Sequence, residues 1–353
     1  MLHRSPAPTT SRSTRRGYLG SLSLTAADAA RGVLHRSSGG PHLQVDAHAH
    51  ALPPRYRDAL RAAGVKAPGG LPFPAWSESA ALGFMRRYGI RAQVVSISDP
   101  GVEFLPVQAS IELARELNDD LADLVRRRPD RFAALAVLPL RDVPASVQEV
   151  GRALDDLRLD GVGLLSNYDG YYLGDPRFRP LLQELDRRGA YVFVHPTSPL
   201  PADKPRRGLP DPIVEFPFET TRTVESLLRA GALQAYPRIR WHLAHAGGLV
   251  PALTDRLARD LPYDPSPALA ALRYDTALSA SPWALAGVRA VAPPEHLLLA
   301  TDWPFTTLLF LFAGTAQPQL RRSVPAEELP GVLAGNILRE LPRLAQAIGA
   351  ARG

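Results

Sequence analysis

Short apolar runs alternate along this chain with longer amphipathic segments rich in alanine, leucine, arginine and glutamate, and this alternation limits the folds that the chain can adopt. Eight runs predict strands, at residues 43–47, 92–97, 132–137, 161–165, 191–194, 240–244, 272–275 and 297–300. Helical periods lie between them, at 105–127, 143–159, 178–188, 221–233 and 249–258. Strands that alternate with helices form parallel sheets, and eight of them in 353 residues predict an α/β fold, a distorted (β/α)8 TIM barrel.

The barrel is expected to occupy residues 41–353 as one domain, because no linker or internal repeat interrupts the alternation. Two stretches rich in proline and glycine, 51–80 and 196–218, follow the first and fifth predicted strands. Active sites of such barrels form at the carboxyl ends of the strands. Both stretches are therefore expected to be walls of a pocket.

Residues 1–40 are rich in serine, threonine, arginine and glycine without a helical period, which predicts a disordered basic tail. Six arginines face one acid there, Asp28, so the tail carries almost all of the formal net charge of +6. The rest of the chain is nearly neutral and has no basic stripe with interleaved aromatic residues. This distribution of charge argues against a nucleic-acid partner.

Part of the tail, Ser-Thr-Arg-Arg-Gly-Tyr-Leu at 13–19, resembles a twin-arginine export signal. The apolar stretch after it is short, contains several serines and is followed by Asp28 and Arg31, which weakens the pattern. We therefore expect a cytoplasmic protein, with export through the twin-arginine pathway as the alternative. No apolar run approaches the ~18 residues that span a bilayer, so no membrane partner is expected.

The chain has no cysteine, so any metal ion must be held by histidine and carboxylate side chains. Four of the nine histidines lie where predicted strands end: His48 and His50 at the first, His195 at the fifth and His245 at the sixth. Asp302 follows the eighth strand in the same way. Side chains two residues apart on a strand point to the same side, so His48 and His50 can face one site. These residues predict a mononuclear metal site at the mouth of the barrel.

The expected metal ligands are His48, His50, His195 and Asp302. Three imidazoles and one carboxylate suit Zn²⁺, with Mn²⁺ as the alternative, and leave a position for water or substrate. His245 comes from the strand between those of His195 and Asp302 and is expected to act as an acid or base beside the metal. His242, three residues earlier, is expected to point out of the barrel interior.

The two lysines, Lys66 and Lys204, lie away from every predicted strand end. A two-metal site often uses a carboxylated lysine on the fourth strand, where this chain has Ser166 and Asn167. One metal ion is therefore expected, and a lysine Schiff base is excluded.

The motifs at the strand ends resemble those of the amidohydrolase superfamily, in the branch of aminocarboxymuconate semialdehyde decarboxylase. The shared motifs are D-x-H-x-H at 46–50, H-P at 195–196, H-A-G-G at 245–248 and T-D-x-P at 301–304, and the resemblance spans about residues 43–345. Further motifs look most like those of 6-methylsalicylate decarboxylases: S-D-P-G-V at 98–102, N-Y at 167–168, Y-L-G-D-P at 172–176, H-P-T-S-P at 195–199 and E-F-P-F-E-T-T-R at 215–222.

The resemblance implies a metal-dependent nonoxidative decarboxylase, a carbon–carbon lyase that releases CO2 from a small aromatic acid such as 6-methylsalicylate or a hydroxybenzoate. It leaves open whether Asp302 or His245 donates the proton to the ring carbon, and it implies a homodimer. A hydrolase or hydratase of a small lactone, amide or unsaturated acid is the alternative, because the same ligands can activate water. A barrel that only binds is disfavoured by the complete ligand set.

Substrate contacts are expected from residues near the strand ends that can hold a carboxylate or an aromatic ring. The candidates are Arg55, Trp76, Asn167, Phe218, Arg222 and Trp303. Arginine pairs well with carboxylates, aromatic side chains pack on rings, and the Asn167 amide can donate a hydrogen bond. Each of these residue types also occurs on ordinary surfaces or in packed cores, which is the competing interpretation for every one of them.

Overall fold

The computed structural model describes residues 42–201, 203, 209–306, 317 and 319–351. The chain divides into two units, Met1–Gly40 and Pro41–Gly353, and the predicted barrel lies in the second. The basic tail and its twin-arginine motif lie outside the described residues. No helix in the described part of the chain combines the length and apolar character that crossing a membrane requires.

Eight parallel strands form the barrel in the predicted order along the chain. They are β1 (Val45–His50), β2 (Ala92–Ser96), β3 (Phe132–Val137), β4 (Gly161–Leu165), β7 (Tyr191–His195), β8 (Arg240–Leu243), β9 (Arg273–Asp275) and β10 (Leu297–Leu298). The last segment returns to the first: the Ala47 N–H donates to the Leu299 carbonyl at 2.8 Å, and the His50 N–H donates to the Trp303 carbonyl at 2.7 Å. The predicted (β/α)8 barrel is thereby confirmed.

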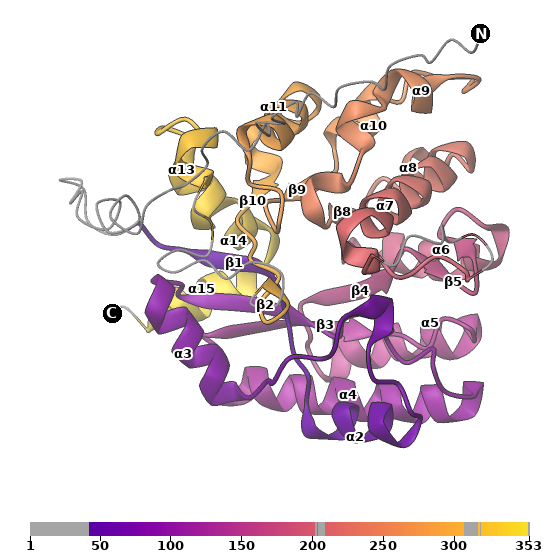
Figure 1. Ribbon diagram of the computed structural model, residues 1–353, viewed down its shortest axis with the longest axis vertical. Coiled ribbons are helices and arrows are strands. Elements are labelled where there is room, and N and C mark those ends of the chain that lie inside the picture. The colour runs from indigo at the N-terminus through magenta and orange to yellow at the C-terminus, as the bar shows by residue number, and fades with distance from the viewer. Residues whose placement is uncertain (1–41, 202, 204–208, 307–316, 318, 352–353) are drawn as a thin grey trace, which may run out of the picture. The chain divides into compact units, whose positions relative to one another are not determined.

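Helices cover the outer side of the barrel, with α4 packed along β3 (Figure 1). The α-helices are α2 (Pro54–Ala62), α3 (Glu78–Tyr88), α4 (Val107–Arg127), α5 (Val143–Gly151), α6 (Arg179–Arg188), α7 (Asp211–Arg229), α8 (Ala232–Ala235), α9 (Thr254–Ala258), α10 (Ser266–Ala270), α11 (Pro282–Val291), α13 (Leu320–Ser323), α14 (Asn336–Glu340) and α15 (Pro342–Ala350). Two single π-turns, η2 (Arg152–Asp156) and η7 (Gly331–Gly335), extend α5 and precede α14. A small hairpin pairs β5 (Asn167–Tyr168) with β6 (Tyr171–Tyr172) beyond β4.

Helix α7 begins ten residues before the predicted start at 221, so that prediction was wrong. Pro212 sits in its first turn, where a missing N–H leaves no hydrogen bond unmade, and Pro217 lies inside the helix. Two prolines in seven residues indicate a loop when only local signals are available. In the structure, burial of one face of α7 overrides them.

The barrel interior is mostly apolar along the strands and becomes polar at their carboxyl ends, which we call the upper end of the barrel. Its buried members include Val45, Ala47, Val94, Leu135, Tyr191, Phe193 and Leu298. Above them, at the carboxyl ends of β1 and β7, stand His48, His50 and His195, which are 1%, 0% and 4% exposed. The closely packed apolar layers thus support the three imidazoles from below.

Candidate metal centre

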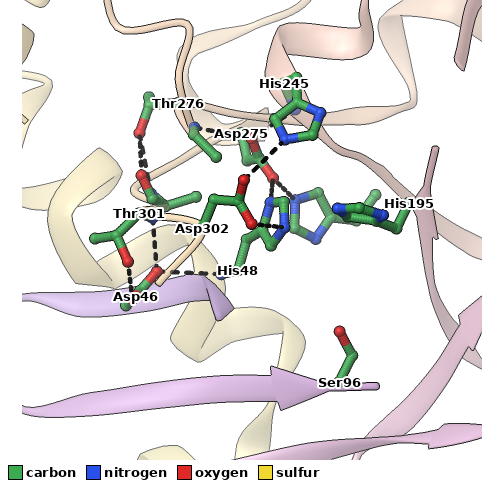
Figure 2. Close-up of polar contacts among 12 residues, drawn as sticks. Asp46, His48, Ser96, His195, His245, Asp275, Thr276, Thr301 and Asp302 are labelled. Atoms are coloured by element: carbon green, nitrogen blue, oxygen red, sulfur yellow. Dashed lines mark hydrogen bonds and ion pairs between the residues drawn. The ribbon is translucent and has the colours of Figure 1, made fainter. Parts of the chain in front are cut away.

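The histidines predicted at three strand ends form one buried cluster with Asp302. The ring centroids of His48 and His50 lie 4.9 Å apart. The ring centroid of His195 lies 5.1 Å from that of His48 and 4.8 Å from that of His50. His245 follows β8, and its ring centroid lies 5.4 Å from that of His195. Figure 2 shows Asp302 between His245 and His48, joined to both by dashed contacts. The structure brings together all five residues that the sequence singled out.

Each of the three strand histidines has a partner at Nδ1, which turns its Nε2 toward the centre of the cluster. Asp275 accepts from the Nδ1 of His48 at 2.8 Å, and the backbone carbonyl of Pro196 accepts from that of His195 at 2.7 Å. The Nδ1 of His50 lies 3.2 Å from the hydroxyl of Ser96. An imidazole whose Nδ1–H is held in this way presents a lone pair on Nε2, which is the arrangement of metal-ligating histidines.

Asp302 supplies the carboxylate of the cluster. Its Oδ1 lies 3.4 and 3.0 Å from the Nε2 atoms of His48 and His50, and its Oδ2 lies 3.5 Å from the Nε2 of His245. Oδ1 is buried and has no hydrogen bond with ordinary geometry within the described residues. Ligand atoms of His48, His195, His245 and Asp302 all lie within 4.8 Å of one another. Convergent nitrogen lone pairs around an unsatisfied carboxylate oxygen fit a divalent cation.

Asp46, the first residue of the D-x-H-x-H motif, holds the loop that carries Asp302. Its carboxylate accepts from the Thr301 backbone N–H at 2.9 Å and from the Thr301 hydroxyl at 2.6 Å (Figure 2). The Asp302 N–H in turn donates to the His48 carbonyl at 2.8 Å, and Asp302 itself has a left-handed backbone with φ of 58°. Burial raises the pKa of Asp46 to about 6, and the hydrogen bonds lower it only in part. Asp46 is therefore a positioning carboxylate, because none of these contacts is with the centre of the cluster.

The protonation states of the buried histidines and carboxylates in the cluster depend strongly on one another. Burial lowers the pKa of His48, but the carboxylates of Asp275 and Asp302 raise it more, to about 10. Burial and the neighbouring imidazoles lower the pKa of His195 well below its usual value. Burial raises the pKa of Asp302, yet His48 and the other imidazoles hold it well below the usual range. The two carboxylates thus favour a positive charge on His48, while His195 stays neutral and able to act as a ligand.

Two features of the site differ from the sequence predictions or were missed by them. His242 points into the barrel, where its Nε2 lies 3.1 Å from Asp275, so the prediction that it points outward was wrong. That prediction assumed that side chains alternate between the two faces of the strand as far as His245. However, β8 ends at Leu243, and His245 has a left-handed backbone with φ of 55°, so the alternation does not extend to His245. Asp275 itself was not identified as a site residue, although it ends the seventh predicted strand as Asp302 follows the eighth.

A cavity beside the cluster is bounded by apolar side chains together with polar residues of the cluster and its surroundings. Its lining consists of Pro68, Leu71, Ser98, Asp99, His195, Pro212, Phe216, His245, Asp302 and Phe305. Pro68 and Leu71 come from the stretch 51–80, and Pro212 and Phe216 come from the stretch 196–218. The prediction that both stretches wall a pocket is confirmed.

The six predicted substrate contacts do not line this cavity within the described residues. Arg55 lies on α2 and pairs with Glu116 and Asp120 of α4 at 3.2 and 3.3 Å. Trp303 is buried in the core and stacks on Phe84, with ring centroids 5.4 Å apart. Both side chains are occupied by partners far away in the sequence.

The remaining four candidates also lie outside the cavity lining. Asn167 and Arg222 both bind the buried carboxylate of Glu219, at 2.7 Å each. Phe218 is 41% exposed beneath the Arg222 guanidinium, two residues along α7 from the cavity-lining Phe216. Trp76 packs, partly buried, against the apolar core between the barrel and its first helices.

Gly248, three residues after His245, is expected to tolerate no side chain. Its φ is 65°, and a Cβ there would meet the Pro217 carbonyl oxygen of α7 well inside van der Waals contact. Gly248→Ala should therefore lower the free energy of unfolding by about 2–3 kcal/mol, measured by urea denaturation. Gly64→Ala is the matched control, because Gly64 has a φ of 72° but open space around it, so that only about 1 kcal/mol of backbone strain is expected. Equal losses in the two variants would contradict the clash.

The chain is similar to known amidohydrolases and decarboxylases. A family profile described as amidohydrolase matches residues 45–343. The 6-methylsalicylic acid decarboxylase of Penicillium expansum is 35% identical over 275 residues, which cover 74% of this chain and 85% of that protein. The gamma-resorcylate decarboxylase of Rhizobium radiobacter is 34% identical over 187 residues, 50% of this chain and 57% of that protein. Among solved structures, an amidohydrolase II has a TM-score of 0.79 and 31% identity, and the match covers 85% of this chain and 99% of the other.

Proposed function

The chain belongs to the amidohydrolase family, and on that premise we propose that it is a metal-dependent nonoxidative decarboxylase of a small aromatic carboxylic acid. The observation that carries the proposal is the convergence of the His48, His50 and His195 rings and the Asp302 carboxylate beside a cavity with several apolar side chains in its lining. The relatives in which such acids are substrates support the same class of reaction. 6-Methylsalicylate is the substrate that we favour, because the 6-methylsalicylic acid decarboxylase covers most of both chains.

One divalent metal ion is bound in this proposal, by His48, His50, His195 and Asp302. Zn²⁺ is favoured by the three imidazoles, and Mn²⁺ is the alternative. The ligand atoms that lie within 4.8 Å of one another are those of His48, His195, His245 and Asp302, so the assignment of His50 as a ligand and of His245 as acid or base is part of the proposal. When bound, the ion would act as a Lewis acid that offsets the negative charge of the substrate carboxylate and fixes its orientation.

The chain's own residues then have three tasks. Leu71, Phe216 and Phe305 surround the aromatic ring and exclude water. A proton is delivered to the ring carbon that bears the carboxylate, from His245 or from Asp302, whose facing atoms lie 3.5 Å apart. The carbon–carbon bond then breaks, its electron pair returns to the ring, and CO2 leaves.

Release of CO2 without ¹⁸O in the aromatic product is the expected result for protein loaded with about one equivalent of Zn²⁺ or Mn²⁺. The assay would use 6-methylsalicylate and 2,6-dihydroxybenzoate in ¹⁸O-labelled water, with metal content measured on the same sample. Chelation should remove the activity, and adding the ion back should restore it. The hydrolase or hydratase alternative predicts the opposite labelling, with ¹⁸O in the product of a lactone, amide or unsaturated acid and no CO2 from either benzoate.

We also propose a homodimer in the cytoplasm, the state favoured by the family resemblance and by the weak export motif. Light scattering of the purified chain gives the oligomeric state, and fractionation of the producing cell gives the compartment.

A further inference from the structure

A chain of four buried residues leads from the lower barrel to the predicted metal site. The Tyr191 hydroxyl lies 2.8 Å from the Nδ1 of His242, and the Nε2 of His242 lies 3.1 Å from the Oδ2 of Asp275. The same Oδ2 lies 2.8 Å from the Nδ1 of His48. All four residues are at most 1% exposed, and they come from β7, β8, β9 and β1.

One assignment of protons satisfies every contact in this chain. An ionised carboxylate only accepts, so His242 must donate from Nε2 and His48 must donate from Nδ1 to reach Asp275. The Tyr191 hydroxyl then donates to the free Nδ1 of His242. In a His48 that carries a single proton, as a metal ligand must, the lone pair is consequently on Nε2, the atom that faces His50 at 3.0 Å and Asp302 at 3.4 Å.

The second oxygen of Asp275 holds the backbone of His245. Oδ1 accepts from the His245 N–H at 2.9 Å and from the Ala277 N–H at 3.0 Å. His245 has φ of 55°, a conformation that a residue other than glycine seldom adopts without support. Asp275 therefore contacts both a predicted metal ligand and the segment that carries the predicted acid or base.

We propose that Asp275 is a positioning residue of this active site, held in place by His242 and Tyr191, which sets the Nε2 tautomer of His48 and the backbone placement of His245. The inference rests on the proposed function, because it assigns a role toward the same metal ion. Partners of this kind typically contribute 10- to 100-fold to metal affinity or activity. Asp275 does not touch the centre of the cluster and is not itself a ligand in this inference.

The decisive variant is Asp275→Asn, which keeps the size of the side chain but introduces an N–H donor. An amide that turns its oxygen to the His245 N–H presents its NH2 to His48, which favours the His48 tautomer with the proton on Nε2. Affinity for Zn²⁺, measured by competition with a chromophoric chelator, should fall by about 10- to 100-fold. The absorption spectrum of the Co²⁺-loaded variant should change as well, because one nitrogen ligand is weakened. A folded Asp275→Asn variant with wild-type Zn²⁺ affinity and spectrum would overturn the proposal.

A second pair of variants tests the remote end of the chain, and it decides the matter if Asp275→Asn does not fold. His242→Leu removes the hydrogen bonds, whereas the amide of His242→Gln can donate to Asp275 and accept from Tyr191. We expect several-fold weaker Zn²⁺ binding in His242→Leu and recovery toward wild type in His242→Gln, at comparable melting temperatures. A purely structural role predicts lower melting temperatures with unchanged Zn²⁺ affinity. Metal affinity is measured without turnover, so a failure of the decarboxylase proposal would appear separately, as metal bound without CO2 release.

Discussion

Asp302→Ala is expected to abolish both metal binding and CO2 release in a chain that still folds. Asp302 is the one carboxylate whose oxygens face His48, His50 and His245, at 3.0 to 3.5 Å, among the residues that the structure describes. Without it, the proposed ligand set has only neutral imidazoles and the proposed proton pathway has lost a member. The loss in kcat/KM should exceed about 10³-fold, equivalent to about 4 kcal/mol of transition-state stabilisation.

The measurement pairs metal content with CO2 release, and circular dichroism shows that the fold is retained. Asp302→Asn separates charge from size, because it keeps the side-chain volume and should still lose most of the metal affinity. Glu295→Ala is the control for the removal of an acid near β10 but outside the cluster. Glu295 is exposed in the turn before β10, and its replacement should leave both readouts unchanged. An Asp302→Ala protein that retains stoichiometric metal and turnover would remove Asp302 from the site.

The residues of the cluster could be predicted because strand ends are local in sequence. His48, His195 and Asp302 each follow an apolar run, and parallel strands in a barrel bring all such ends to one face. No distance had to be known for this step, only the order of the elements. The same logic would have identified Asp275, had the seventh predicted strand, at residues 272–275, been treated like the others.

The substrate contacts could not be predicted in the same way, because long side chains are assigned by tertiary neighbours. Arg55 lies five residues after His50, yet its guanidinium is held by Asp120, 65 residues further along the chain. Phe216 and Phe218 share one motif, but the helix that unexpectedly includes both turns only Phe216 into the cavity. Local sequence gives the type of side chain, and the packing of α2 and α7 decides where it points.

His245→Asn is expected to separate catalysis from metal binding. His245 is held by its backbone to Asp275, and its Nε2 is buried without a hydrogen-bond partner among the described residues, 3.5 Å from the Oδ2 of Asp302. A side chain so placed is available to exchange a proton with a bound substrate. Its replacement should lower kcat by about 10²- to 10⁴-fold, the usual contribution of a general acid or base, while KM and metal content stay near wild type.

The opposite pattern would change the assignment of the residue. Because the ligand atoms of His245 and His48 belong to one group within 4.8 Å, a His245→Asn protein that loses its metal would make His245 a ligand. His50→Asn is the matched control, since it removes an imidazole from the same cluster and should lower metal affinity first and turnover as a consequence. If His245→Asn retains both metal and full turnover, Asp302 alone must supply the proton, and the two schemes that the sequence left open are then distinguished by a single variant.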